Sequence, residues 1–295
     1  DYDIALGFEA NEALHFGAAL TLSSLDYELS SYYHEAFREN NYLKLENAMS
    51  ISGFGGRVGL GLLYEPVEGL RLGASVYTPT FYFISRGEGV YDKKIGSVTT
   101  PQSAANSYGL RGAWRLGLNG AYFIGRHGFF SVDYDYTGGA LNLRDNTYDE
   151  YGEGGAEYTN INSSLKTNFG GIHTIRLGAE AMLSDRIALR AGYRYSSSPV
   201  KNSRLKGDMA STEVLVSGPA VHYTLPDSQN SFSLGAGFRI TPSLSLDLAY
   251  VNSQTKARTF AFPYIEDKTG ELVGMQAVKE TNQRHKAVAT LSIRF

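Results

Sequence analysis

The sequence predicts an all-β fold, and within that class a transmembrane antiparallel β-barrel. Apolar and polar residues alternate along most of the chain, the alternating stretches are long, and the connections between them are short and long in turn. Successive side chains of a strand point to opposite faces, so each stretch has one apolar face and one polar or small face. Residues Ile187–Tyr195 show this pattern, with Ile187, Leu189 and Ala191 on one face and Arg190 and Arg194 on the other.

Composition excludes several other classes. Charged residues are only 19% of the chain and aromatic residues are 13%, the opposite of a disordered sequence. The chain has no cysteine, which excludes a disulfide scaffold and cysteine-ligated zinc or iron–sulfur sites. A membrane-spanning helix needs roughly 18 or more consecutive apolar residues, and the chain has no such run. The net charge of −3 gives no indication of nucleic-acid binding.

Eleven strands are expected, most of them ten or more residues long. Ordinary strands have about 5–6 residues, whereas a tilted membrane strand needs about 9–11. Length therefore favours a membrane barrel over a soluble sandwich. The expected strands lie near 2–9, 14–32, 50–65, 69–85, 106–125, 128–144, 171–184, 186–197, 230–241, 243–260 and 284–295.

The expected connections form a second signal. Short ones lie near 10–13, 66–68, 125–127, 185 and 242, and long ones near 33–49, 86–105, 145–170, 198–229 and 261–283. Membrane barrels have short turns on the periplasmic side and longer loops outside. Within 33–49 the spacing of Phe37, Tyr42, Leu45 and Met49 also suggests a helix.

The order of the strands predicts a single barrel domain, residues 1–295, that lacks its N-terminal part. The last stretch alternates up to the terminal Phe295, which resembles the recognition signal of bacterial outer-membrane barrels. If this strand ends in the periplasm, strand 2–9 must run inward as well, so an odd number of strands is expected before it. Barrels of this class have an even number of strands, which agrees with eleven here.

The two faces of the strands suggest different roles. Tyrosines near strand ends on the apolar face suit the aromatic girdles of a barrel: Tyr64, Tyr122, Tyr193, Tyr195 and Tyr250. Arginines on the other face are expected in the lumen: Arg57, Arg71, Arg111, Arg115, Arg176, Arg190, Arg194 and Arg239, with Asp133, Asp135, Glu180 and Asp247 as partners. These charges either pair to keep the interior rigid or bind an anion such as a carboxylate. Aromatic residues at strand ends and in loops, such as Phe81, Phe83 and residues 260–265, either collect hydrophobic molecules or pack loops on one another.

Enzyme and metal motifs are absent from the sequence. It has no nucleophile elbow, no zinc-protease motif and no phosphate-binding loop, and its six histidines share no metal-like spacing. We therefore expect a protein that is not an enzyme and has no cofactor.

Several segments, in order, resemble one family. They are GLGLLYEP at 59–66, LRLGASVYTP at 70–79, WRLGLNGAY at 114–122, SVDYDY at 131–136, HTIRLGAE at 173–180, LRAGY at 189–193, LPD at 225–227, FSLGAGF at 232–238 and LSLDLAY at 244–250. Together they are similar to the long-chain fatty acid transporter (FadL / OmpP1 / TodX) family. The resemblance implies a 14-stranded barrel with an N-terminal hatch, capture of hydrophobic substrates at the outer loops, and release sideways at a kinked early strand. This chain would then supply strands 4 to 14, without the hatch or the kinked strand.

The function expected from this resemblance is uptake of hydrophobic compounds, such as long-chain fatty acids or aromatic hydrocarbons, through the outer membrane of a Gram-negative bacterium. The candidate substrate contacts are Tyr77, Phe81, Phe83, Arg176, Arg190 and Arg239. Expected partners are the hydrophobic substrate, outer-membrane lipid, lipopolysaccharide and the barrel assembly machinery, but not nucleic acid. A general porin, a haemin receptor and a barrel-anchored surface adhesin stay open as alternatives.

Overall fold

The computed structural model describes residues 1–37, 42–95, 98–139, 141–145, 158–201, 223–261, 265–266, 269, 272–273 and 276–294. The main sheet contains β1 (Tyr2–Asn11), β2 (Leu14–Ala36), β3 (Tyr42–Val67), β4 (Leu70–Tyr77), β5 (Phe81–Ile95), β6 (Val98–Arg111), β7 (Trp114–Phe123), β8 (Gly128–Gly138), β9 (Asn142–Asp145), β10 (Ile172–Ser184), β11 (Ile187–Ser196), β12 (Tyr223–Thr241), β13 (Leu244–Phe260) and β16 (Val278–Ile293). A separate hairpin contains β14 (Ile265–Glu266) and β15 (Leu272–Val273), and α1 spans Thr159–Asn168.

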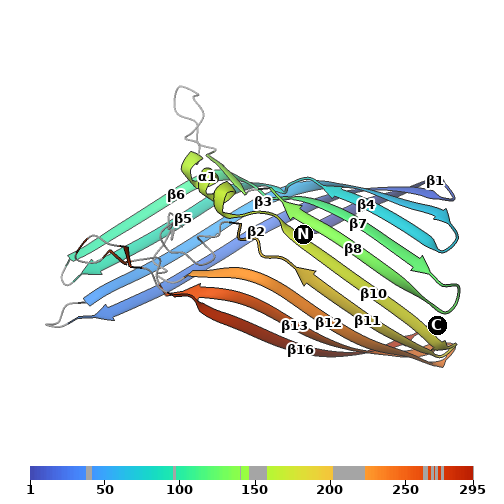
Figure 1. The fold of residues 1–295 in the computed structure, drawn as a ribbon. Coiled ribbons are helices and arrows are strands. Elements are labelled where there is room, and N and C mark those ends of the chain that lie inside the picture. Colours follow the sequence, from blue (N-terminus) through green and yellow to red (C-terminus); the bar gives the residue numbers. More distant parts are fainter. Residues whose placement is uncertain are drawn as a thin grey trace.

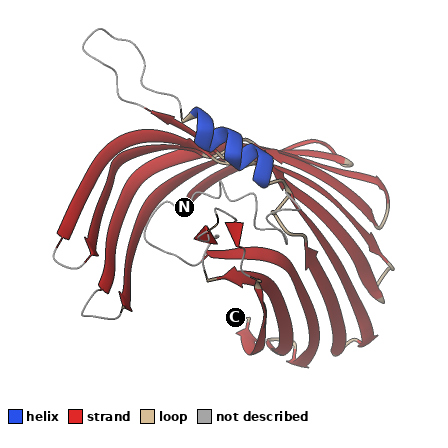
Figure 2. Ribbon diagram, turned by 60° about the vertical axis from the view of Figure 1, so that its left-hand side comes forward, coloured by secondary structure: helices blue, strands red, loops and turns tan. Residues whose placement is uncertain are grey.

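All pairings in the main sheet are antiparallel, and the sheet curls around an interior (Figures 1 and 2). Its 14 strand segments make 11 wall strands, because β4 and β5, β6 and β7, and β8 and β9 each continue one another between the same neighbours. The predicted all-β antiparallel fold is therefore confirmed. In the described residues β1 pairs only with β2 and β16 only with β13, so the sheet has two open edges.

Three adjacent wall strands are interrupted at neighbouring positions. The first break lies at 78–80, where Pro79 has no N–H to donate to the ladder, and Thr78 bridges it by accepting a bond from the Val58 N–H through Oγ1 at 3.1 Å. The second lies at 112–113, where the Gly112 N–H bonds to the Thr80 carbonyl at 2.9 Å. The third follows Gly138, and Gly139 there has φ +98°, a conformation that favours glycine. The predicted strands 69–85, 106–125 and 128–144 are therefore each split in two.

One end of the sheet carries tight turns, as predicted. The turn between β3 and β4 needs Gly69, which has φ +85°, and a Cβ there would lie 2.8 Å from the Phe123 carbonyl oxygen. The turns of this end, together with the C-terminus, lie on the right in Figure 1, and the long hairpins β2–β3 and β5–β6 project to the left.

Two predicted long connections are wrong. The described residues of these ranges, 33–36 with 42–49 and 86–95 with 98–105, are instead the outer parts of paired strands, with Ala36 opposite Tyr42 and Ile95 opposite Val98. The helix suggested within 33–49 is wrong for the same reason. These outer parts of the strands need no apolar face. The alternation of apolar and polar residues therefore weakens there, although the backbone hydrogen bonds between the strands continue. Likewise β12 begins at Tyr223 and β16 at Val278, earlier than the expected 230 and 284.

The described residues bury few apolar side chains. One small cluster contains Val200, Leu225 and Phe260, with Phe169 and Tyr223 packed against it, at the outer ends of β12 and β13 and beyond the end of β11. Helix α1 lies across the strands where the long hairpins and the remaining strands diverge (Figure 2). Asn162 of α1 makes two hydrogen bonds with the backbone of Leu143, both of 2.8 Å, and so covers the free edge of β9. No helix in the described part of the chain is both long and apolar enough to cross a bilayer.

Candidate functional site

The two faces of the sheet differ in chemistry. One face exposes large apolar side chains, for example Leu60 at 57%, Leu116 at 46% and Leu118 at 60%. The other face lines one cavity, the lumen chamber, to which strands from β1 to β13 contribute. Because residues from both sides of the curved sheet line this cavity, it lies on the concave face, and the apolar side chains point away from the interior.

The lumen chamber has a volume of about 820 Å³. Small residues form one hydrogen-bonded row across β1, β2, β3, β4 and β7, and its members Ser75 and Gly117 line the chamber. The row contains Gly7, Gly17, Gly61, Ser75 and Gly117. Charged side chains lie elsewhere in the lining: Asp3, Arg57, Arg115, Asp135, Arg176, Arg194, Asp227 and Lys256.

Tyr77 faces the lumen chamber. Its ring lies flat over Gly59, where a Cβ would come within 2.4 Å of the ring, and the Arg57 guanidinium lies 5.8 Å from the ring centroid. Arg115 is the register partner of Tyr77 on β7. The structure thus places this predicted contact residue between two lumen cations.

Phe81 and Phe83 lie on the opposite face from Tyr77. Gly59 pairs with Tyr77 and Gly56 pairs with Phe81, so the interruption at 78–80 inserts one extra residue into the strand opposite β3. A single extra residue moves all following side chains to the other face. Phe81 and Phe83 are accordingly 50% and 67% exposed on the apolar outer face. They do not line the lumen chamber with Tyr77, and a role for them in substrate binding stays a prediction.

Two of the three arginines predicted to contact substrate are engaged by acids. Arg176 of β10 is hydrogen-bonded to Asp135 of β8. Arg190 of β11 donates to Glu180 of β10 and Asp247 of β13, each at 2.6 Å. The predicted partners Asp135, Glu180 and Asp247 are confirmed as ion-pair partners. Because the positive charge of Arg190 is already paired with two carboxylates, it is not available to bind an anionic substrate.

The third predicted arginine lies apart from these. Arg239 is near the end of β12, opposite Ser245, and its N–H bonds to the Arg186 carbonyl in the neighbouring tight turn. Within the described residues it has no ion pair. Arg176, Arg190 and Arg239 do not form one cluster, and a role for them in substrate binding stays a prediction.

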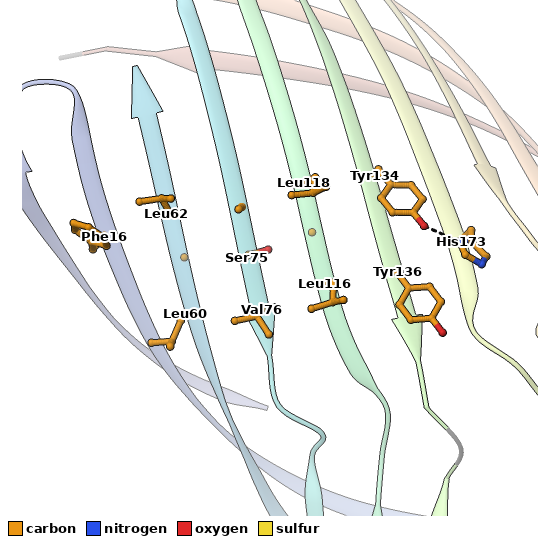
Figure 3. Close-up of a pocket in the computed structure, with 13 residues that line it drawn as sticks. Phe16, Leu60, Leu62, Ser75, Val76, Leu116, Leu118, Tyr134, Tyr136 and His173 are labelled. Carbon is orange, nitrogen blue, oxygen red and sulfur yellow. Dashed lines mark hydrogen bonds between the residues drawn. The ribbon is translucent and has the colours of Figure 1, made fainter. Parts of the chain in front are cut away.

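The outer face carries an apolar groove of about 810 Å³ across β2, β3, β4, β7, β8 and β10. Leu60, Leu62, Val76, Leu116 and Leu118 lie along it, and Phe16 and His173 mark its two sides (Figure 3). The Tyr134 hydroxyl is hydrogen-bonded to His173 Nδ1 at 2.8 Å at one end. The sequence did not predict this groove.

A repeated pair of residues borders the outer apolar face. The Tyr193 hydroxyl donates to the Asn230 side-chain oxygen at 2.9 Å, and the Tyr250 hydroxyl is bonded to His285 Nδ1 at 2.6 Å. In both pairs, as in Tyr134–His173, the bonded partner lies on the neighbouring strand. It is two residues away from the residue directly opposite the tyrosine, in the direction away from the tight turns. Tyr193 and Tyr250 were predicted as girdle residues, but their polar partners depend on register, which one strand's sequence does not contain.

An ion pair fixes the outer part of β12 and β13. Arg258 is only 7% exposed and donates to both carboxylate oxygens of Asp227 at 3.0 Å. Nearby, burial raises the pKa of Tyr223 above its ordinary value. Burial, followed by the charge of Tyr158, likewise raises the pKa of Tyr108. Both phenols therefore stay neutral over the physiological pH range.

Metal-like clusters are not found in the part of the chain that the structure describes: no group of three or more His, Asp or Glu side chains could hold an ion there.

Comparisons with known proteins show the fold. No protein-family model matches the chain, and no curated protein matches its sequence. A FadL homologue of Pseudomonas aeruginosa matches with a TM-score of 0.61 at 13% identity, over 99% of this chain and 67% of that one. The toluene transporter TodX of Pseudomonas putida matches at 0.50 and 14%, over 99% and 68%. The toluene transporter TbuX of Ralstonia pickettii matches at 0.50 and 11%, over 98% and 66%.

This chain thus has the FadL-type β-barrel fold, as its resemblance to that family predicts, and it spans about two thirds of the length of these structures.

Proposed function

We propose that the chain forms most of the wall of an outer-membrane channel for the uptake of hydrophobic compounds. The observation that carries this proposal is an apolar outer face around a lumen chamber lined by small and charged residues, in a fold shared with two toluene transporters. An exposed apolar face of this extent is rare on a soluble monomer, and lipid is its natural environment.

The outer face fits the thickness of an outer membrane. On β7 the outward residues Trp114 and Tyr122 flank Leu116 and Leu118. Eight residues at about 3.3 Å each, tilted by about 40°, span roughly 20 Å of membrane depth, close to the apolar band of about 25 Å that such barrels have. Outer-membrane lipid and lipopolysaccharide are the partners of this face.

The open edges call for further strands. A bilayer leaves no strand edge unpaired, yet β1 and β16 each have one neighbour and are exposed along their length. We infer that an odd number of further strands of the same protein joins them, which gives an even total and a closed barrel; the number is three if the barrel has the 14 strands that the family resemblance implies. Insertion of such a barrel requires the barrel assembly machinery of the outer membrane.

Adjacent alanines of β2 offer a matched test. Ala19 lines the lumen chamber, whereas Ala18 is exposed on the outer face. Ala19→Phe fills the passage and Ala18→Phe adds an apolar side chain facing lipid. In cells that lack related channels, the unmodified protein is expected to raise the uptake rate of radiolabelled toluene and dodecanoate. Ala19→Phe should lower that rate severalfold, and Ala18→Phe should leave it unchanged.

Two results would overturn the proposal. One is equal uptake with and without the protein. The other is equal uptake by the Ala19→Phe and unmodified proteins, which would separate the lumen chamber from the transport path.

A further inference from the structure

The apolar groove on the outer face runs between two rows of outward side chains and ends at polar ones (Figure 3). Each row continues from strand to strand through register partners. One row is Phe16, Leu62, Ala74, Leu118 and Tyr134, and the other is Leu60, Val76, Leu116, Tyr136 and His173. Gly61, Ser75 and Gly117 lie between the rows and complete the lining.

The groove is inclined to the membrane plane. It crosses six strands from β2 to β10, and strands lie about 4.8 Å apart, so it is roughly 24 Å long. A row perpendicular to strands that tilt by about 40° passes through roughly 15 Å of membrane depth over this length, which is more than half of the apolar band of about 25 Å.

The polar end of the groove lies on the outer side of the membrane. Phe16 is close to the start of β2, which follows a tight turn, whereas Tyr136 and His173 are near the ends of β8 and β10 that are far from the tight turns. Tight turns of such barrels are periplasmic. The polar end therefore lies in the outer leaflet, and the apolar part extends from there toward the inner leaflet.

The polar end is preformed. The Tyr134 hydroxyl is hydrogen-bonded to His173 Nδ1 at 2.8 Å, and the ring centroids of Tyr136 and His173 are 5.0 Å apart. A Cβ at Gly138 or Gly171 would collide with the Tyr136 ring, so these two glycines allow the ring to lie against the sheet. When Tyr134 donates to Nδ1, the proton of a neutral His173 is on Nε2, which is then a donor for an anionic oxygen.

An amphipathic anion suits this arrangement. The apolar length of the groove fits one acyl chain, and its polar end offers an imidazole and a phenol. None of the described residues that line the groove is acidic, so an anion at the polar end meets no carboxylate there. In the outer leaflet of an outer membrane, the lipid with acyl chains and phosphate groups is lipopolysaccharide.

We propose that this groove is a binding site for lipopolysaccharide. One acyl chain of the lipid lies in the groove, and His173 and Tyr136 donate hydrogen bonds to a phosphate oxygen of its headgroup. This inference rests on the proposed function, because it takes the outer face as embedded in an outer membrane.

Trp114 can report the occupancy of the site. It is the only tryptophan of the chain, the next outward residue after Leu116 on β7, and the register partner of Gly138, over which the Tyr136 ring lies. The full chain is inserted into vesicles of phosphatidylcholine with brominated acyl chains, because bromine quenches the emission of an indole that it contacts. Lipopolysaccharide, which carries no bromine, is then added in steps.

Preferential binding predicts recovery of Trp114 emission at a low content of lipopolysaccharide. The mole fraction that restores half of the emission should be about tenfold lower than for unbrominated phosphatidylcholine, the preference that one charge-assisted hydrogen bond can give. Ala74→Phe fills the groove between Leu62 and Leu118 and should abolish this preference. Ala181→Phe, on the outer face of β10 but outside the groove, is the matched control and should leave the preference unchanged.

The phosphate contact is tested separately. His173→Phe keeps an aromatic ring against Tyr136 but removes the donor, so the preference should fall about tenfold. The control is His285→Phe, which breaks the similar Tyr250–His285 pair outside the groove and should change nothing. Removal of the phosphate groups from the lipopolysaccharide should lower the preference of the unmodified protein by the same factor and that of His173→Phe no further, because both changes remove one interaction. Additive losses would overturn the phosphate contact.

Quenching of Trp114 before the addition of lipopolysaccharide verifies that each variant has inserted, and His173→Phe still tests the site if Ala74→Phe does not insert. Equal recovery with lipopolysaccharide and with phosphatidylcholine in the unmodified protein would overturn the inference and leave the proposed function standing. Recovery that follows the protein-to-lipid ratio alone would also overturn it, because a second copy of the chain would then cover the groove. If brominated lipid does not quench Trp114 at all, the outer face is not in lipid and the proposed function itself fails.

Discussion

Replacing Leu118 by arginine should strongly destabilise the protein in a bilayer, whereas the same change at Asn119 should not. The two residues are neighbours on β7 and point to opposite faces. Leu118 is 60% exposed on the outer face and lies four residues from both Trp114 and Tyr122, which puts it near the middle of the apolar band. Asn119 faces the lumen, where its side chain lies over Gly73.

The magnitude follows from depth. An arginine facing lipid at the midplane of a barrel costs about 2–4 kcal/mol, and this cost falls to about 0–1 kcal/mol near the interfaces. Leu118→Arg is therefore expected to lower the free energy of unfolding by about 2–4 kcal/mol. Asn119→Arg adds a charge to a face that already carries arginines, and a change within about 0.5 kcal/mol is expected.

Denaturant unfolding in phospholipid vesicles measures both. The chain has a single tryptophan, Trp114, at the outer boundary of the apolar band, so its emission reports insertion without interference from other indoles. Equal losses for the two variants, or a larger loss for Asn119→Arg, would refute the assignment of the faces and with it the placement of the outer face in lipid.

Two other predictions concern local packing. Gly59→Ala places a methyl group only 2.4 Å from the Tyr77 ring, so the free energy of unfolding in the same assay should fall by about 1–3 kcal/mol. The double variant Gly59→Ala/Tyr77→Ala should recover most of this loss. No recovery would contradict the clash. Asn162→Ala removes both hydrogen bonds to the Leu143 backbone. Hydrogen exchange of the Leu143 amide should therefore accelerate about fivefold or more, which corresponds to a loss of about 1 kcal/mol in the free energy of local opening. An unchanged exchange rate would mean that α1 does not protect the edge of β9.

Period-two alternation was sufficient to predict the wall strands and their faces. Where a strand has lipid on one side, every second residue must be apolar, so stretches such as Ile187–Tyr195 show their strand and their face together. This is why eleven wall strands could be predicted from sequence and are found in the sheet. The charged partners Glu180 and Asp247 of Arg190 were also predictable as a set, because all three lie on the non-apolar face.

Pairing details were beyond the sequence because they depend on neighbouring strands. The extra residue at 78–80 moves Phe81 and Phe83 to the outer face, and the signal for it was Pro79, which suits a bulge better than a central strand position. Arg190 and Arg194 lie on the same face of β11, yet Arg194 is opposite Ser231 and Arg190 is held by two acids. Which arginine is free is decided by register, not by local sequence.

One row of register partners on the outer face shows how the strands tilt. The row has one residue from each wall strand: Phe8, Phe16, Leu62, Ala74, Leu118, Tyr134, Ile175, Tyr195, Asn230, Gln254 and Gln283. The row changes from aromatic through aliphatic to aromatic again and ends on amides. A row perpendicular to tilted strands runs obliquely through a membrane, from one interface across the hydrocarbon to the other and beyond it. The order of residue types along this row is therefore what a tilted barrel in a bilayer requires, and an upright cylinder would give rows of uniform polarity instead.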